Sequence, residues 1–159
     1  MNGIAVPYFG AIMIKRIFYV IAICLTLSAC GTFKTNAVAE GQEVFVPPDR
    51  LSAYQKPESG YAKFTITRDT GLLGGGCYLG VAIEGKPAAR LDTGEMAVFY
   101  VKPGMVAITV MYDPEGRGLC ALSSGMEPVT RMYKISLEKT KRFRLSSRQY
   151  RRPLLEELN

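Results

Sequence analysis

The chain has 159 residues, a formal net charge of +6 and no histidine. The missing histidine excludes Ser-His-Asp and Cys-His catalysis and imidazole zinc sites, and the two cysteines beyond the N-terminal region cannot alone complete a zinc tetrahedron. A chain of this length suits one domain with an adequate core. We therefore expect a non-enzymatic domain without catalytic residues, a metal or another cofactor.

The N-terminal region has the layout of a secretory signal peptide. Lys15 and Arg16 precede the apolar run Ile17–Leu27. This run is too short to span a bilayer, because a transmembrane helix needs about 20 apolar residues. We predict that residues 1–29 are a cleaved signal helix, and Met13 offers a more compact positively charged start than the first methionine does.

The end of this region resembles the lipobox of bacterial lipoproteins. In Leu27–Gly31, two small residues lead directly to Cys30. The resemblance implies that the Cys30 thiol receives a diacylglycerol and becomes the mature N-terminus. Because Gly31 is not an aspartate, the resemblance also implies sorting to the outer membrane, with the domain in the periplasm. Several acyl chains anchor a protein far more firmly than one chain, whose binding is marginal.

The rest of the chain has the pattern of a tethered all-β domain. Residues 30–60 are polar and contain three prolines, so we predict a flexible, lipidated tether with one short strand at Glu43–Val46. From Tyr61 onward, short alternating runs separated by turn signals are typical of a sandwich or barrel, and we predict a β-sandwich over residues 61–148. The expected strands are Tyr61–Arg68, Cys77–Ile83, Pro87–Leu91, Met96–Val101, Met105–Tyr112, Met132–Leu137 and Arg142–Ser146, with turns at Glu84-Gly85 and Pro103-Gly104.

Cys77 and Cys120 remain when the signal peptide is removed and Cys30 is lipidated. In an oxidising envelope, an even pair predicts a disulfide. A reactive cysteine is the alternative, but it needs a base that forms the thiolate, and the chain has no histidine. The glycine-rich stretch 71–76 is followed by a strand pattern and has no GK[ST] sequence, so we interpret it as a loop and not as a phosphate cradle.

Positive charge is concentrated near the C-terminus, where residues 131–152 contain nine basic side chains and one acidic side chain. We expect the last two strands to form a hairpin that exposes many of these charges on one face. The candidate contacts to an anionic partner are Lys141, Arg142, Arg144 and Arg148. A solvated strand face without a ligand is the alternative. Residues 149–159 are expected to be a C-terminal tail, with Tyr150–Leu158 as a short helix or an ordered segment.

A series of short motifs through the middle of the chain resembles a known group of proteins. The motifs, in order, are Gly76-Cys77, Ile83–Lys86, Ala89–Leu91, Thr93–Glu95, Phe99–Val101, Pro103-Gly104, Gly118–Cys120 and Lys141–Arg144. They resemble those of small proteobacterial outer-membrane lipoproteins, whose β-domain is comparable in layout to PEGA-type and other Ig-like surface domains. The resemblance covers about residues 61–146 and implies an Ig-like or PEGA-like β-sandwich. Its motifs are turn and core positions, so it carries over no catalytic residues.

The sequence therefore favours a lipid-anchored envelope protein that acts as a non-enzymatic binding or assembly module. One alternative is an accessory lipoprotein of a secretion system of the type VI kind, whose lipoproteins have similar size and topology. Another is a binder of anionic lipid or lipopolysaccharide, whose charge contacts salt would screen over about 10 Å at 0.1 M. A carboxylate hydrolase is least favoured. Expected partners are the membrane, through the lipid anchor, and an envelope protein or anionic glycolipid; nucleic acid is not expected.

Overall fold

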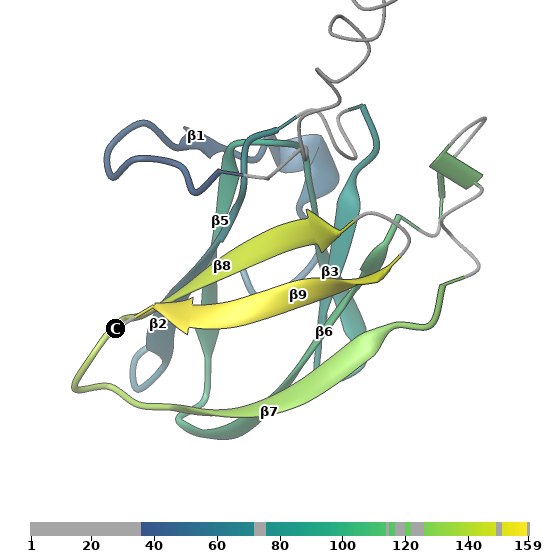
Figure 1. Cartoon of the computed structure of the whole chain (residues 1–159). Coiled ribbons are helices and arrows are strands. Elements are labelled where there is room, and N and C mark those ends of the chain that lie inside the picture. The colour runs from purple at the N-terminus through teal and green to yellow at the C-terminus, as the bar shows by residue number, and fades with distance from the viewer. Residues whose placement is uncertain are drawn as a thin grey trace, which may run out of the picture. The chain divides into compact units, whose positions relative to one another are not determined.

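The computed structural model describes residues 36–71, 76–113, 115–116, 120–121, 126–148 and 151–158, without the side chains of Arg148 and Arg151. These residues form two β-sheets that pack around one hydrophobic core (Figure 1), which confirms the predicted all-β sandwich. The predicted signal peptide and the predicted lipidation site Cys30 lie outside the described residues. Within the described ranges, no helix has the length and apolar character needed to cross a membrane.

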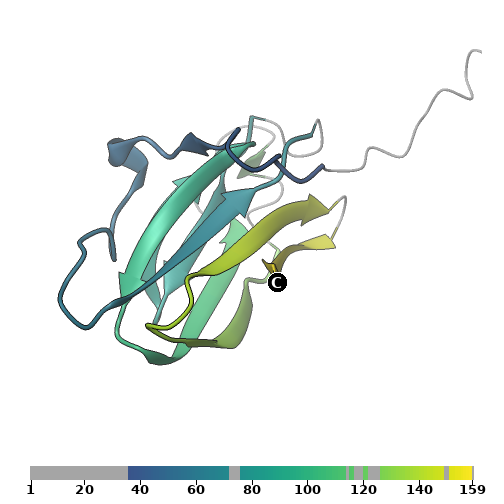
Figure 2. The ribbon, with the colours of Figure 1, turned by 90° about the vertical axis from the view of Figure 1, so that its left-hand side faces the viewer.

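The first sheet has five strands in the order β1-β5-β2-β8-β9. Its strands are β1 (Val44–Phe45), β2 (Ala62–Arg68), β5 (Glu95–Val101), β8 (Lys141–Arg148) and β9 (Arg151–Leu158). Figure 2 shows β5, β2 and β8 side by side. β2 pairs antiparallel with β5 but parallel with β8, so the first long strand lies beside a strand from near the C-terminus.

The second sheet has four antiparallel strands in the order β4-β3-β6-β7. Its strands are β3 (Leu79–Ile83), β4 (Lys86–Leu91), β6 (Gly104–Tyr112) and β7 (Val129–Ile135). β6 buries Val106, Ile108 and Val110 while the residues between them are partly exposed, as expected for a strand with one face on the core. A short 3₁₀ helix, η1 (Pro48–Arg50), lies between β1 and β2.

An aromatic cluster joins the two sheets. Phe64 of β2, Phe99 of β5 and Phe143 of β8 are fully buried. The ring centroid of Phe64 lies 5.3 Å from that of Phe99 and 5.8 Å from that of Phe143. Tyr133 of β7, in the other sheet, brings its ring centroid to 4.7 Å from that of Phe143. Aromatic pairs at such distances add about 0.5–1.5 kcal/mol each beyond their burial, so the cluster fixes how the sheets meet.

The predicted turn at Glu84 and Gly85 is confirmed as the two-residue connection between β3 and β4. Both residues have positive φ, 49° for Glu84 and 74° for Gly85. This is the pattern of a type I′ turn, whose twist matches that of paired strands. Glycine adopts this conformation without steric cost. Glu84 gains a compensating contact, because its Oε1 accepts a 2.6 Å hydrogen bond from the backbone N–H of Ala107.

The C-terminal segment differs from the expected short helix or ordered tail: residues Arg151–Leu158 form strand β9, paired antiparallel with β8. Leu155 is buried opposite Leu145. The alternation of this strand is hidden in the sequence, because two leucines and then two glutamates stand side by side. Pairing with β8 places Leu155 on the core face, while both glutamates are exposed.

The predicted hairpin between the last two expected strands is wrong, because β7 and β8 lie in different sheets. Residues 136–140 carry the chain from one sheet to the other. Ile135 and Phe143 are both buried, so the two strands cover the core from opposite sides instead of sharing one face. The hairpin at the C-terminus is β8–β9, and β7 begins three residues earlier than the expected strand.

The described part of the predicted tether, residues 36–60, packs against the sandwich instead of standing free. β1 pairs in parallel with the start of β5. Val46 is only 4% exposed, and Leu51 forms an isolated bridge to Ala89 of β4. The edge of β5 offers unpaired backbone groups, and Val46 and Leu51 supply apolar contacts. The folded domain therefore begins well before residue 61.

Candidate anion-binding groove

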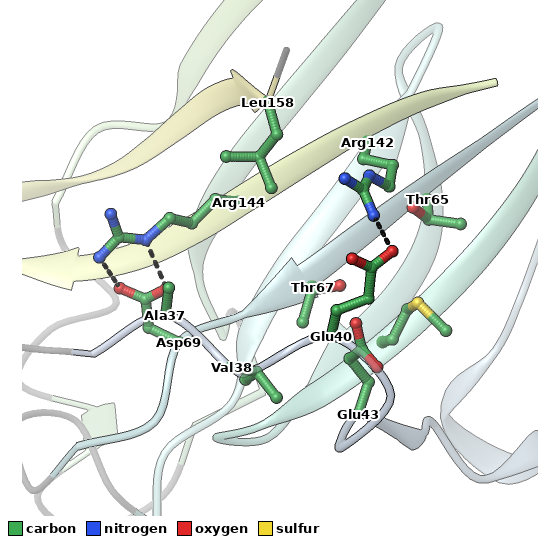
Figure 3. A pocket seen from close by; sticks show the side chains of 11 residues that line it. Ala37, Val38, Glu40, Glu43, Thr65, Thr67, Asp69, Arg142, Arg144 and Leu158 are labelled. Carbon is green, nitrogen blue, oxygen red and sulfur yellow. Dashed lines mark hydrogen bonds and ion pairs between the residues drawn. The ribbon is translucent and has the colours of Figure 1, made fainter. Parts of the chain in front are cut away.

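The outer face of the five-stranded sheet carries a groove of about 170 Å³ (Figure 3). Its cover is residues 36–43, which we call the strap; its walls include Glu40 and Glu43 from the strap. Two 2.9 Å backbone hydrogen bonds between Asn36 and Thr70 fix one end of the strap, and β1 continues from the other. The groove thus lies between the strap and the outer face of β2 and β8, which are distant from the strap in the sequence.

Alternation along two neighbouring strands supplies the floor of the groove. On β2, Thr65 and Thr67 lie between the core positions and point outward, and on β8 Arg142 and Arg144 do the same. Thr65 is paired with Arg142 and Thr67 with Arg144 in the parallel register. The sequence predicted that the two arginines share a face, and the structure brings them together at this groove.

Arg144 is held by a buried acid. Its Nε and Nη2 donate to the two carboxylate oxygens of Asp69 at 2.7 and 2.8 Å, and the Asp69 side chain is only 2% exposed. The hydrogen bonds to Asp69 raise the pKa of Arg144. Both oxygens of Asp69 are buried and accept hydrogen bonds from Arg144. This arginine therefore has a structural role, because breaking the pair would leave the Asp69 carboxylate buried without its partner.

Arg142 is held loosely in comparison. Its Nη1 lies 2.6 Å from Oε1 of Glu40 on the strap, but the two side chains are 50% and 82% exposed. Exposed pairs of this kind contribute about 0–1 kcal/mol, because water and salt compete for both charges. The ion pair of Arg142 is therefore exchangeable, in a groove whose described lining carries three acids, Glu40, Glu43 and Asp69, and two arginines.

Of the remaining candidate contacts, Lys141 does not line this groove. Lys141 alternates with Arg142 and faces the other side of the sheet, where its Nζ lies 2.6 Å from Oε1 of Glu157. The side chain of Arg148 lies outside the described residues. Arg152 pairs with Glu127. The basic run in the sequence is therefore divided between two sheets and partly neutralised by acids from elsewhere in the chain.

A second charged region, which the sequence did not indicate as a site, closes the end of the sandwich near the strap. Arg68 of β2 is 1% exposed, and its Nη1 donates to the carbonyl oxygens of Cys77 at 2.6 Å and of Leu91 at 2.7 Å. Burial lowers the pKa of Arg68, an effect that Asp92 and other nearby groups oppose. The sequence did contain an indication of this position. Arg68 continues the alternation of Phe64 and Ile66, which places its side chain on the core face.

Two further arginines at this end lie over one tyrosine ring. The Cζ atoms of Arg50 and Arg90 are 4.5 and 5.1 Å from the ring centroid of Tyr78. Arg50 makes a two-point contact with Glu95, and Arg90 makes one with Asp113. These hydrogen bonds raise the pKa of both arginines. Because each guanidinium has its own carboxylate, the arrangement acts as a brace between η1, β4 and β5.

The predicted disulfide joins Cys77 and Cys120, whose Cα atoms are 5.4 Å apart. It lies at the same end, since the carbonyl of Cys77 is a partner of Arg68. Of the glycine-rich stretch 71–76, residues 72–75 lie outside the described residues, as do three of the residues just before Cys120. In the described part of the chain, no group of three or more Cys, Asp or Glu side chains is arranged to hold a metal ion.

Comparisons with known proteins were made at three levels: a scan against protein-family models, a search of curated proteins and a search of solved structures. None of the three found a match.

Proposed function

We propose that this protein is a lipid-anchored protein of the bacterial envelope whose β-sandwich is a non-enzymatic binding or assembly module. The observation that carries the proposal is the Cys77–Cys120 disulfide, because disulfides persist in oxidising compartments and are rare in the cytosol. The lipobox-like sequence Leu27–Gly31 supports the same compartment and supplies the anchor.

The position of the strap adds a geometric expectation to the proposal. The backbone is fixed to the sandwich at Asn36, six residues after Cys30. Six extended residues span roughly 20 Å. A lipid on Cys30 would therefore lie no more than this distance along the chain from Asn36, which is much closer to the sandwich than the predicted tether of residues 30–60 implies.

Metabolic labelling with a radioactive fatty acid in bacterial cells tests the anchor. We expect label on the wild-type chain, none on Cys30→Ala, and full label on the matched control Cys24→Ala, whose cysteine lies inside the predicted signal peptide. Cell fractionation should place the labelled protein in the outer membrane. Equal labelling of Cys30→Ala and wild type, or no label on either, would overturn the proposed anchor.

A second candidate function is the binding of anionic lipid or lipopolysaccharide in the groove, and the exposed Arg142–Glu40 pair is the observation that favours it. The test measures binding to phosphatidylglycerol vesicles in a Cys30→Ala background, so that the anchor does not contribute. Arg142→Glu should lose the binding. Arg152→Glu is the matched control, because Arg152 is 57% exposed and also pairs with an exposed glutamate. Equal binding by both variants would exclude the groove.

A further inference from the structure

A second cavity, of about 370 Å³, lies at the end of the sandwich away from the disulfide. Tyrosines from three places in the chain line it: Tyr54 in the segment after η1, Tyr61 just before β2 and Tyr100 near the end of β5. Lys56 and Lys86 stand at the same cavity. The volume falls in the range of about 300–1,000 Å³ that small-molecule sites occupy.

Backbone contacts fix the wall that carries two of these rings. The backbone N–H of Tyr100 donates to the carbonyl of Tyr54 at 2.8 Å, and that of Ser52 donates to Ala88 of β4 at 2.9 Å. Tyr54 has a φ of 63°, a conformation that is a true outlier for a bulky side chain. Backbone strain of this kind concentrates at binding sites, where surrounding contacts maintain it. The two hydrogen bonds fix the backbone of this wall to β5 and β4.

The chemistry of the lining selects the ligand. A tyrosine offers a flat apolar ring and a hydroxyl at its tip, whereas Ala53 is the only aliphatic side chain among the described residues of the lining. An acyl chain would find few apolar partners here. A sugar ring has C–H faces that fit aromatic rings and hydroxyl edges that fit polar tips. Two exposed lysines and the acid Glu58 in the described lining give it a net positive charge, which adds a preference for negative charge.

We propose that this tyrosine pocket, defined by Tyr54, Tyr61, Tyr100, Lys56 and Lys86, binds a sugar unit of a negatively charged glycan. The rings stack on the sugar, and the two ammonium groups contact a carboxylate or phosphate next to it. The pocket uses none of the groove residues and does not depend on lipid anchorage, so it can be tested separately from the proposed function.

The test measures binding of the full chain, purified in detergent, to two glycans that differ in their acid. One is insoluble peptidoglycan, whose acids are carboxylates, assayed by co-sedimentation. The other is lipopolysaccharide on beads, whose acids include phosphates. Lys56→Glu/Lys86→Glu should weaken binding about tenfold at low salt. Lys134→Glu/Lys139→Glu makes the same change of charge at exposed lysines outside the pocket and should bind like wild type.

A ring-deletion pair separates stacking from charge. Tyr61→Ala/Tyr100→Ala should weaken binding about tenfold, because each aromatic contact is worth a factor of about two to ten. Tyr61→Phe/Tyr100→Phe keeps the rings and should lose less. The glycan bound by wild type identifies the source of the acid. The proposal is overturned if wild type binds neither glycan, or if the lysine variant binds like its control.

Discussion

Arg142 and Arg144 are two residues apart on the same face of β8, yet their ion pairs differ in burial. Asp69, the partner of Arg144, is 2% exposed, whereas Glu40, the partner of Arg142, is 82% exposed. A charge that is buried without its partner costs several kcal/mol, while an exposed charge returns to water at little cost. The same residue type at neighbouring outward positions thus has a structural role in one case and an exchangeable contact in the other.

Arg144→Ala should lower the free energy of unfolding by about 2–3 kcal/mol, because it leaves the Asp69 carboxylate buried without its two-point partner. Arg142→Ala is the control and should cost less than about 1 kcal/mol. Urea unfolding followed by circular dichroism measures both. Equal effects of the two substitutions would contradict the difference in burial.

The environment of Tyr133 predicts that the free energy of unfolding falls at alkaline pH. Burial raises the pKa of Tyr133, and its hydroxyl donates a 3.2 Å hydrogen bond to the carbonyl of Leu155. The folded state therefore favours the neutral phenol. The stability gained from this preference is complete below the unfolded-state pKa of about 10 and is lost as the pH rises through the higher folded-state value.

The comparison of wild type with Tyr133→Phe isolates this contribution, because phenylalanine keeps the ring contact with Phe143. Wild type should be more stable by about 1 kcal/mol near neutral pH, from the hydrogen bond. The difference should shrink above about pH 10. Urea unfolding over a pH series measures it; a difference that stays constant to the alkaline end would show that the phenol does not titrate with folding.

The sequence allowed part of this residue-scale detail to be predicted. Alternation correctly placed Arg142 and Arg144 on one face, and the number of cysteines, with the expectation of an oxidising compartment, correctly paired Cys77 with Cys120. The acidic partners of these arginines could not be predicted. Glu40 and Asp69 are distant from β8 in the sequence, and only the arrangement of the strands brings them close to it. The polar character of Arg68 concealed that it occupies a core position.

Two elements, the strap and β9, extend the sandwich beyond the boundaries that the sequence pattern suggested. β9 covers the core beside β8, and the hydroxyl of Tyr133 in the other sheet reaches its backbone. The strap covers the outer face of the same sheet instead. Strands such as β2 and β8 were found because apolar and polar side chains alternate along them. β1 and β9 gave weaker signals, since one pairs over only two residues and the other contains like residues in doublets.

Substitution in β9 distinguishes a strand from a loosely attached tail. Leu155 is 2% exposed and Leu158 is 41% exposed. Leu155→Ala should cost about 2–5 kcal/mol, as expected for a fully buried leucine, whereas Leu158→Ala should cost much less. Chemical denaturation gives both values. A small effect at Leu155 would mean that β9 does not contribute to the core in solution.

At the scale of the whole molecule, the fold class could be predicted but the arrangement of strands could not. Short alternating runs correctly indicated an all-β sandwich. They carry no information on which strands are neighbours, so β7 and β8 were taken as a hairpin although they lie in opposite sheets. The parallel β2–β8 pair has no local signature, because it depends on residues from both ends of the domain.

The disulfide should be the main covalent contribution to global stability. Its cysteines are 43 residues apart, and closing a loop of this length stabilises a fold by about 4 kcal/mol in the chain-entropy account. A thiol reductant should therefore lower the melting temperature of wild type but leave Cys77→Ser/Cys120→Ser unchanged. The two single variants should match the double variant. If the reductant left the melting temperature of wild type unchanged, this role of the disulfide would be contradicted.

The parallel pairing of β2 with β8 also governs when the protein can fold. A growing chain produces β2 early, but the neighbour that completes its sheet is among the last segments to be synthesised. Contacts between such distant segments slow folding to about milliseconds or seconds. Until β8 arrives, the edge of β2 with which it pairs remains open to other chains, which is a known route to aggregation. The chain is therefore expected to depend on a holding chaperone until its C-terminal strands have been made.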